Sequence, residues 1–238
     1  MGKDKLKRFR ELEGLDRVIQ PAFEEAYQRD YQLKGKWKQE LFGNDRPLVL
    51  ELGCGKGEYT VGLARLYPDR NFMGLDIKGA RIWKGAKTAH EEGLDNVAFL
   101  RTRIDFINSF FGRDEVDELW VTFPDPQDKK RRQKKRLTGD TFLNYYRHFL
   151  KDGGFVNLKT DNLALYEYTR ELAKLNKLEI DWCTDDLDQA GRRDETVNIR
   201  TFYENQFRAD GIKIKYIRFR LPSGKEIKAL PHESHRIF

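Results

Sequence analysis

Between residues 47 and 221, short apolar runs alternate with stretches of helical periodicity, and this alternation restricts the fold more than any other feature. The apolar runs predict strands at 48–52, 71–76, 97–100, 119–123, 155–159, 178–182 and 212–221. The periodic stretches predict helices at 58–67, 80–92, 140–150 and 163–175. Strands that alternate with helices pair in parallel through right-handed crossovers. The sequence therefore predicts an α/β fold with a doubly wound, mostly parallel seven-stranded sheet.

The length of 238 residues suits one large domain with modest additions. Residues 1–46 are polar and irregular, and we expect an N-terminal extension packed on the core. Residues 47–221 hold the strand–helix pattern and form the predicted main domain, and residues 222–238 form a C-terminal tail.

Several classes of protein are excluded by composition. No apolar run approaches the ~18 residues of a membrane helix, and the first residues do not resemble a signal peptide. Two cysteines, Cys54 and Cys183, cannot form a disulfide framework, and no Cys/His spacing matches a zinc site. We therefore expect a cytoplasmic protein with no bound metal and no membrane contact.

Positive charge is concentrated in residues 129–136, here called the basic strip, where seven of eight residues are Lys or Arg. The rest of the chain holds 38 basic and 39 acidic residues. Adjacent like charges repel one another, and a phosphate backbone would relieve that repulsion while releasing its own counterions. The strip is either a solvated surface or a contact for a polyanion, and its place in the fold must decide between them.

The first predicted strand leads into Gly53-Cys54-Gly55-Lys56-Gly57, here called the glycine loop. A dinucleotide fingerprint would need Gly or Ala where this chain has Glu58, and a carboxylate there would repel a pyrophosphate. The pattern instead fits a ligand that lacks phosphates and carries an ammonium group, such as S-adenosylmethionine. We assign Glu51, Gly53, Gly55 and Gly57 to this cofactor.

Three aspartates follow other predicted strands. Asp76 closes the second strand, where a carboxylate can accept hydrogen bonds from both ribose hydroxyls, and Asp105 could meet the adenine edge. Asp125 stands between Pro124 and Pro126, which restrict the backbone on both sides, and the basic strip follows directly. A polyanion bound to the strip would therefore lie beside the cofactor, which favours the second interpretation of the strip.

The run Phe123-Pro124-Asp125-Pro126, followed by the basic strip and Leu137, resembles the signature of bacterial tRNA (guanine-N7-)-methyltransferases. The resemblance continues through Lys159-Thr160-Asp161 and Thr201-Phe202-Tyr203-Glu204. It implies a Rossmann-like class I methyltransferase fold. It also implies methyl transfer from S-adenosylmethionine to N7 of a guanine in the tRNA variable loop, at position 46 by the tRNA convention.

The resemblance also implies roles for individual residues. Asp125 would be catalytic and would line the cofactor site together with Glu51, Asp76 and Asp105. Substrate and RNA contacts would come from Lys129, Arg131, Arg132, Lys134, Lys135, Arg136, Asp161, Thr201, Tyr203 and Glu204. The chain departs from the family pattern at Gln127, where the family usually has Trp, and at Cys54 and Lys56, where it usually has bulky apolar residues.

Two other functions remain open on the residues alone. One is a methyltransferase that acts on an exocyclic base amine of RNA or DNA. The order Pro-Asp-Pro-Gln disfavours it, because such enzymes usually place an aromatic residue after the prolines. The other is a non-catalytic RNA-binding protein with the same fold. The sequence is equally compatible with a monomer and a homodimer.

Overall fold

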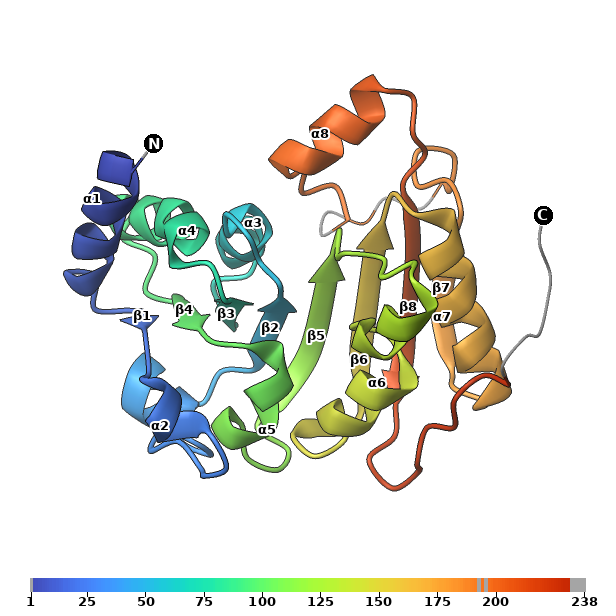
Figure 1. Cartoon of the computed structure of the whole chain (residues 1–238), viewed down its shortest axis with the longest axis horizontal. Coiled ribbons are helices and arrows are strands. Elements are labelled where there is room, and N and C mark those ends of the chain that lie inside the picture. Colours follow the sequence, from blue (N-terminus) through green and yellow to red (C-terminus); the bar gives the residue numbers. More distant parts are fainter. Residues whose placement is uncertain (1, 192–193, 195–196, 232–238) are drawn as a thin grey trace.

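The computed structural model describes residues 2–191, 194 and 197–231. A twisted sheet runs through its centre with strand order β1-β4-β3-β2-β5-β6-β8-β7 (Figure 1). The strands are β1 (Val18–Ile19), β2 (Leu48–Leu52), β3 (Asn71–Asp76), β4 (Val97–Arg101), β5 (Val116–Thr122), β6 (Leu150–Thr160), β7 (Ile180–Thr184) and β8 (Lys215–Leu221). Every neighbouring pair is parallel except those that include β8, which confirms the predicted doubly wound, mostly parallel α/β fold.

The helices connect the strands and cover both faces of the sheet. They are α1 (Gly2–Glu13), α2 (Phe23–Ala26), α3 (Glu58–Leu66), α4 (Gly79–Glu91), α5 (Ile107–Phe110), α6 (Asp140–Tyr146), α7 (Leu163–Leu175) and α8 (Phe202–Ala209). Shorter turns of other helical types are η1 (Trp37–Phe42), η2 (Ile104–Phe106) and η3 (Lys130–Lys135).

The described sheet has eight strands where the sequence predicts seven. The additional strand is β1, which comes from the N-terminal extension and pairs in parallel with β4 at Phe99 and Leu100. Two residues are too few to show an alternation of apolar and polar side chains, so periodicity does not detect such a strand. Helix α6 is also shorter than predicted, because Leu150 already pairs with Val116.

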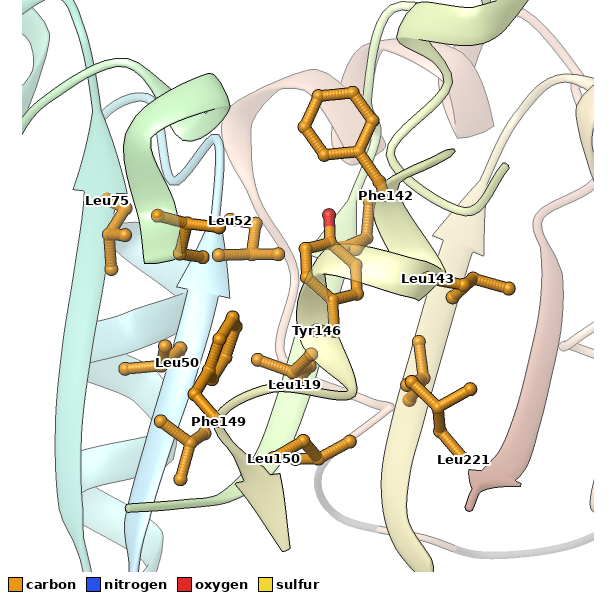
Figure 2. Packing of buried hydrophobic residues seen from close by; sticks show 14 of the residues in the cluster. Leu50, Leu52, Leu75, Leu119, Phe142, Leu143, Tyr146, Phe149, Leu150 and Leu221 are labelled. Carbon is orange, nitrogen blue, oxygen red and sulfur yellow. The ribbon is translucent and has the colours of Figure 1, made fainter. Parts of the chain in front are cut away.

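Two apolar layers enclose the sheet. Helices α1, α3 and α4 pack on one face, against residues such as Phe72 and Phe99. Helices α5, α6 and α7 pack on the other face, where Leu50, Leu119 and Tyr146 meet (Figure 2). Because both faces are covered, all five residues of the central strand β2 are buried.

The N-terminal extension is anchored to the second layer through Trp37, whose side chain is fully buried. Its indole Nε1 donates a 2.7 Å hydrogen bond to the carbonyl of Phe110, and its backbone N–H donates to the Glu115 carboxylate at 3.0 Å. A buried tryptophan whose N–H donates a hydrogen bond removes a large apolar surface from water and is also fixed in its orientation. This contact fixes the extension beside α5.

Three glycines form the space that the ring of Phe99 fills. A Cβ atom at Gly57, Gly74 or Gly85 would lie 2.6 to 2.9 Å from that ring. At Gly85 the Cβ would also lie 2.7 Å from the carbonyl oxygen of Lys56 and 2.8 Å from Cα of Gly57. The absence of side chains therefore lets α4 approach the glycine loop closely.

We expect Gly85→Ala to destabilise the protein by about 1–3 kcal/mol, because the new methyl group would press on backbone atoms that cannot move aside. A loss of stability would be specific to this close packing, because a Gly to Ala substitution inside a helix usually stabilises the protein by about 1 kcal/mol. Urea unfolding measures the effect. The control is Gly14→Ala after α1, where the new Cβ would meet only the carbonyl oxygen of Glu11 at 3.6 Å, and its loss should be smaller. Equal stability of Gly85→Ala and wild type would contradict this packing.

Candidate active site

The carboxyl ends of the parallel strands meet at one edge of the sheet, where α/β proteins bind their ligands. Glu51 near the end of β2 is level with Gly74 in β3 and with Trp120 in β5. Thr122 at the end of β5 is level with Lys159 in β6. The segments that follow β2, β3, β5 and β6 therefore all emerge at this edge. These are the segments in which the sequence places most of the candidate residues.

Glu51 lies below this edge and is 2% exposed. One carboxylate oxygen accepts hydrogen bonds from the backbone N–H of Thr60 at 2.9 Å and from the Thr60 hydroxyl. The other accepts from the hydroxyl of Thr122 at 2.5 Å. Burial raises the pKa of Glu51 to about 7, although these hydrogen bonds act to lower it. The carboxyl therefore joins β2, α3 and β5, a role that the predicted contact with a cofactor did not include.

The glycine loop folds back onto the end of β3. Gly53, Gly55 and Gly57 all have positive φ values of 77°, 56° and 69°, a region that favours glycine. The N–H of Gly55 donates to one oxygen of Asp76 at 3.0 Å, and the N–H of Lys78 donates to the other at 2.8 Å. The structure thus brings Asp76 against the glycine loop.

Asp105 lies in η2, which follows β4. In the sheet, β3 separates β4 from β2, the strand that leads into the glycine loop. Its side chain is exposed and forms an ion pair with Arg103 at 2.8 Å. Arg103 also lies over the ring of Phe106 at 5.5 Å. Asp105 thus contacts its own sequence neighbours, and no hydrogen bond or ion pair joins it to the glycine loop among the described residues.

Asp125 lies in an exposed turn after β5 and accepts a hydrogen bond from the N–H of Gln127 at 3.1 Å. The residues that flank the two prolines, Phe123 and Gln127, have φ values of 47° and 53°. Positive φ is unfavourable for a bulky residue such as Phe, and such strain concentrates at functional sites. The turn, residues 123–128, is therefore held in one unusual shape.

Arg136 is a correction to the predicted RNA contacts. Its side chain is 6% exposed, donates a 3.0 Å hydrogen bond to the carbonyl of Pro126, and lies 4.3 Å from the ring centre of Tyr168. A buried guanidinium engaged in this way supports the turn that holds Asp125 and does not face a phosphate. The next residue, Leu137, lies 3.9 Å from the position of a Cβ at Gly53. This contact brings the segment after the strip against the glycine loop.

The other six cations of the strip are exposed. They are Lys129, Lys130, Arg131, Arg132, Lys134 and Lys135. Most of them lie on η3, a short turn without a hydrophobic face, and none forms an ion pair with another described residue. They form an unneutralised surface directly after the turn that contains Asp125.

Glu204 is a second correction, because its side chain is fully buried and cannot touch a substrate. It forms an ion pair at 2.7 Å with Lys159, which is also fully buried and donates hydrogen bonds to the carbonyls of Val197 and Ile199. Burial lowers the pKa of Lys159 to about 8, although the charge of Glu204 acts to raise it. This pair attaches α8 to the end of β6.

The remaining predicted residues lie around this attachment. Thr201 accepts a hydrogen bond from the N–H of Glu204 at 3.2 Å and caps α8. Tyr203 is 39% exposed, and the ring of its neighbour Phe202 lies 3.6 Å from the ammonium of Lys56 in the glycine loop. Asp161 is half-buried at the end of β6, and burial raises its pKa.

Sequence reasoning missed the partners that hold these groups in place. The contact of Thr122 depends on the register of β2 against β5, and that of Thr60 depends on how α3 packs on β2, neither of which local sequence reveals. The sequence predicts for Glu58 only a negative charge in the first turn of α3. In the structure it pairs with Lys84 at 3.0 Å and accepts a hydrogen bond from the N–H of Phe202 at 2.8 Å, so it anchors α8.

No group of three or more metal-binding side chains occurs within residues 2–191, 194 and 197–231. Across the same described residues, no helix combines the length and the apolar character needed to span a membrane.

The fold is that of Rossmann-like class I methyltransferases. A solved structure of the 16S rRNA methyltransferase KamB superposes with a TM-score of 0.61 at 16% identity, covering 87% of this chain and 99% of that one. An antibiotic-related methyltransferase superposes with a TM-score of 0.56 at 16% identity, covering 76% of this chain and 90% of that one. At such identities the likeness concerns the fold alone.

Sequence comparison gives the family. The sequence model of a family described as “Putative methyltransferase” matches residues 45–217. The tRNA (guanine-N(7)-)-methyltransferase of Christiangramia forsetii is 52% identical, over 92% of this chain and 98% of that protein. The enzyme of the same name from Bacteroides thetaiotaomicron is 47% identical, over 93% of this chain and 87% of that protein. The chain belongs to the tRNA (guanine-N(7)-)-methyltransferase family, as its sequence motifs predict.

The raised pKa of Glu51 predicts a pH-dependent stability difference. Between pH 4.5 and about 7, folded Glu51 holds a proton that the unfolded chain has released, so this group contributes less stability as pH rises through that window. Glu51→Gln removes the titration. We expect Glu51→Gln to gain up to about 3 kcal/mol relative to wild type between pH 5 and pH 8 in urea unfolding. A difference between the two proteins that stays constant with pH would contradict the burial of a titrating carboxyl.

Proposed function

We propose that this chain transfers the methyl group of S-adenosylmethionine to N7 of a guanine in tRNA, and that the guanine is at position 46 in the variable loop. The observation that carries this proposal is the arrangement of the turn that holds Asp125. Glu51 and Leu137 fix this turn against the glycine loop, and six exposed cations follow it. The names of the relatives, which match almost the whole chain, support the same reaction.

The glycine loop and Asp76 fit the proposed cofactor. A Cβ at Gly55 would meet nothing within 4 Å, so the backbone there faces space that a ligand can enter. Each oxygen of Asp76 accepts one backbone hydrogen bond and keeps a further lone pair for a ribose hydroxyl. S-adenosylmethionine, when bound, supplies an electrophilic methyl group on a positively charged sulfur.

In this reaction the protein contributes mainly by positioning the methyl donor and the guanine. Guanine N7 has a free lone pair and no proton, so a bond to the methyl carbon can form while the bond from that carbon to sulfur breaks, without a general base. Holding the two reactants in line can supply about 7–11 kcal/mol of the barrier. The strained turn that carries Asp125 and the end of β6 that carries Asp161 are suited to hold the base.

The purine becomes cationic as it accepts the methyl group. A carboxylate that accepts hydrogen bonds from guanine N1–H and from its exocyclic amine becomes a better partner as that charge develops. Asp125 is suited to this role because its second oxygen forms no hydrogen bond with a described residue and its side chain is exposed at the site edge. The exposed cations of the strip act earlier, on docking of the phosphate backbone.

The proposed reaction is tested by incubating the protein with methyl-labelled S-adenosylmethionine and bulk tRNA, followed by strand cleavage selective for N7-alkylated guanine. We expect label in tRNA and cleavage at one variable-loop guanine. Labelled tRNA that resists this cleavage would indicate an exocyclic amine as acceptor. No transfer despite binding of both ligands would leave an RNA-binding protein without activity.

Asp125→Asn keeps the size of the side chain and removes its charge. If the carboxylate stabilises the cationic purine, the single-turnover rate at saturating tRNA should fall on the order of 100-fold, comparable to the loss of one electrostatic group in other enzymes. The dissociation constant for tRNA should change much less than the rate, because the phosphate contacts of the strip remain. A single-turnover rate close to wild type would show that Asp125 does not stabilise charge.

A further inference from the structure

Helices α1 and α4 lie side by side on one face of the sheet, at the end that carries β4 and β1 (Figure 1). Trp83 in α4 donates a 2.6 Å hydrogen bond to Glu11 in α1. Phe9 of α1 lies so close to Gly79, the first residue of α4, that a Cβ there would be 2.8 Å from its ring. Because α4 begins directly after β3, these contacts place the first turns of α4, and the part of α1 around Phe9 and Glu11, near the same edge of the sheet as the candidate site.

The two helices share an excess of positive charge. Helix α1 holds five Lys or Arg and three acids, and residues 78–91 hold four Lys or Arg and one acid. The two segments are far apart in the chain, and both belong to the nearly neutral remainder outside the basic strip. Packing of α1 on α4 joins them into one surface.

Most of these cations have no acidic partner. The exposed side chains of Arg10, Lys78 and Arg81 form no ion pair with any residue that the structure describes. Lys7 pairs with Glu11 at 3.9 Å and Lys87 with Glu91 at 3.7 Å, but these side chains are largely exposed, and such pairs contribute little. We call the surface formed by Lys7, Arg8, Arg10, Lys78, Arg81 and Lys87 the α1–α4 face.

A solvated surface is the simplest alternative, but it does not explain the bias in sign. Surfaces of folded proteins usually intersperse charges of both signs, and a single-sign field raises the energy of the folded state. Among the described residues, only Lys7 and Lys87 of the α1–α4 face have an acidic partner, and both pairs are long and largely exposed. A phosphate backbone would supply a counter-charge and would release condensed cations on binding.

The face also lies within reach of RNA that enters the site. From β5, which precedes the basic strip, to β4 there are three strand steps in the order β5-β2-β3-β4. At ~4.8 Å per step this is about 14 Å. A nucleic acid backbone, with a phosphate about every 3.4 Å along each strand, covers that span in about four nucleotides.

We propose that the α1–α4 face is a second binding surface for the phosphate backbone of the RNA substrate, on the opposite side of the candidate site from the basic strip. This inference rests on the proposed function for the identity of the polyanion. The substrate would then contact the protein on both sides of the site edge, which fixes its orientation over the turn of Asp125 better than one contact can.

The test compares three triple variants of the full chain in tRNA binding between 50 and 200 mM salt. The first removes cations of the face (Arg10→Ala, Arg81→Ala, Lys87→Ala). The second removes cations of the strip (Lys130→Ala, Arg131→Ala, Lys134→Ala). The control removes three exposed cations at the opposite edge of the sheet (Lys36→Ala, Arg113→Ala, Lys174→Ala).

We expect the face variant to reduce the slope of log K against log salt by about 2, since each lost phosphate contact removes about 0.7–0.9. Affinity at 100 mM salt should fall roughly tenfold. S-adenosylmethionine binding and the single-turnover rate at saturating tRNA should match wild type. The control should keep the wild-type slope. Arg10→Lys with Arg81→Lys should also keep it, because a point charge suffices for a phosphate.

Three results would overturn the inference in different ways. If the strip variant flattens the slope and the face variant behaves like the control, the proposed function stands and the α1–α4 face is not an RNA contact. If wild-type protein does not bind tRNA at all, the proposed function fails and this inference fails with it. Loss of binding to anionic vesicles in the face variant, with an unchanged tRNA slope, would assign the face to a membrane instead.

Discussion

The geometry of the candidate site depends on one buried carboxyl group that three elements share. Glu51 in β2 binds Thr60 in the first turn of α3 and Thr122 at the end of β5. A buried donor without its acceptor costs about 1–3 kcal/mol, so both elements are held in register with β2. The glycine loop lies between Glu51 and Thr60, and the turn of Asp125 follows Thr122 directly. The two segments that meet at the site are therefore positioned by the same side chain.

Helix α8 reaches the site by different means, because it does not continue a strand of the edge. The buried pair of Lys159 and Glu204 joins it to β6, while Glu58 binds its first backbone N–H. A buried ion pair contributes little net stability compared with apolar packing, but breaking one partner leaves a buried charge. Such a pair favours one placement of the helix over others. This placement of α8 is what puts Thr201 and Tyr203 at the glycine loop.

The sequence predicts those features whose cause is local. Apolar periodicity gives the strands and helices of residues 47–221, and the glycine and proline signals mark both loops of the site. It does not predict that Arg136 turns inward while its neighbours stay exposed, or that Glu204 is buried beside Lys159, because both depend on where another element packs. For the same reason the sequence does not predict β1, whose two residues form a strand only because they pair with β4. Long-range register is the information that one sequence lacks.

The distribution of charge over the molecule also favours an oriented encounter with a polyanion. At the edge opposite the site, acids are paired: Asp117 binds Lys38 at 3.0 Å as well as Lys151, and although burial raises its pKa, these hydrogen bonds hold it below the usual value. At the site edge, the six exposed cations of the strip and Arg10, Lys78 and Arg81 of the α1–α4 face form no ion pair with a described residue, and Lys7 and Lys87 form only long, largely exposed pairs. Neutralised acids on one side and free cations on the other produce a field that points a nucleic acid toward the site. Such a field raises the rate of association and fixes orientation, and it leaves the methyl-transfer step to the groups around Asp125.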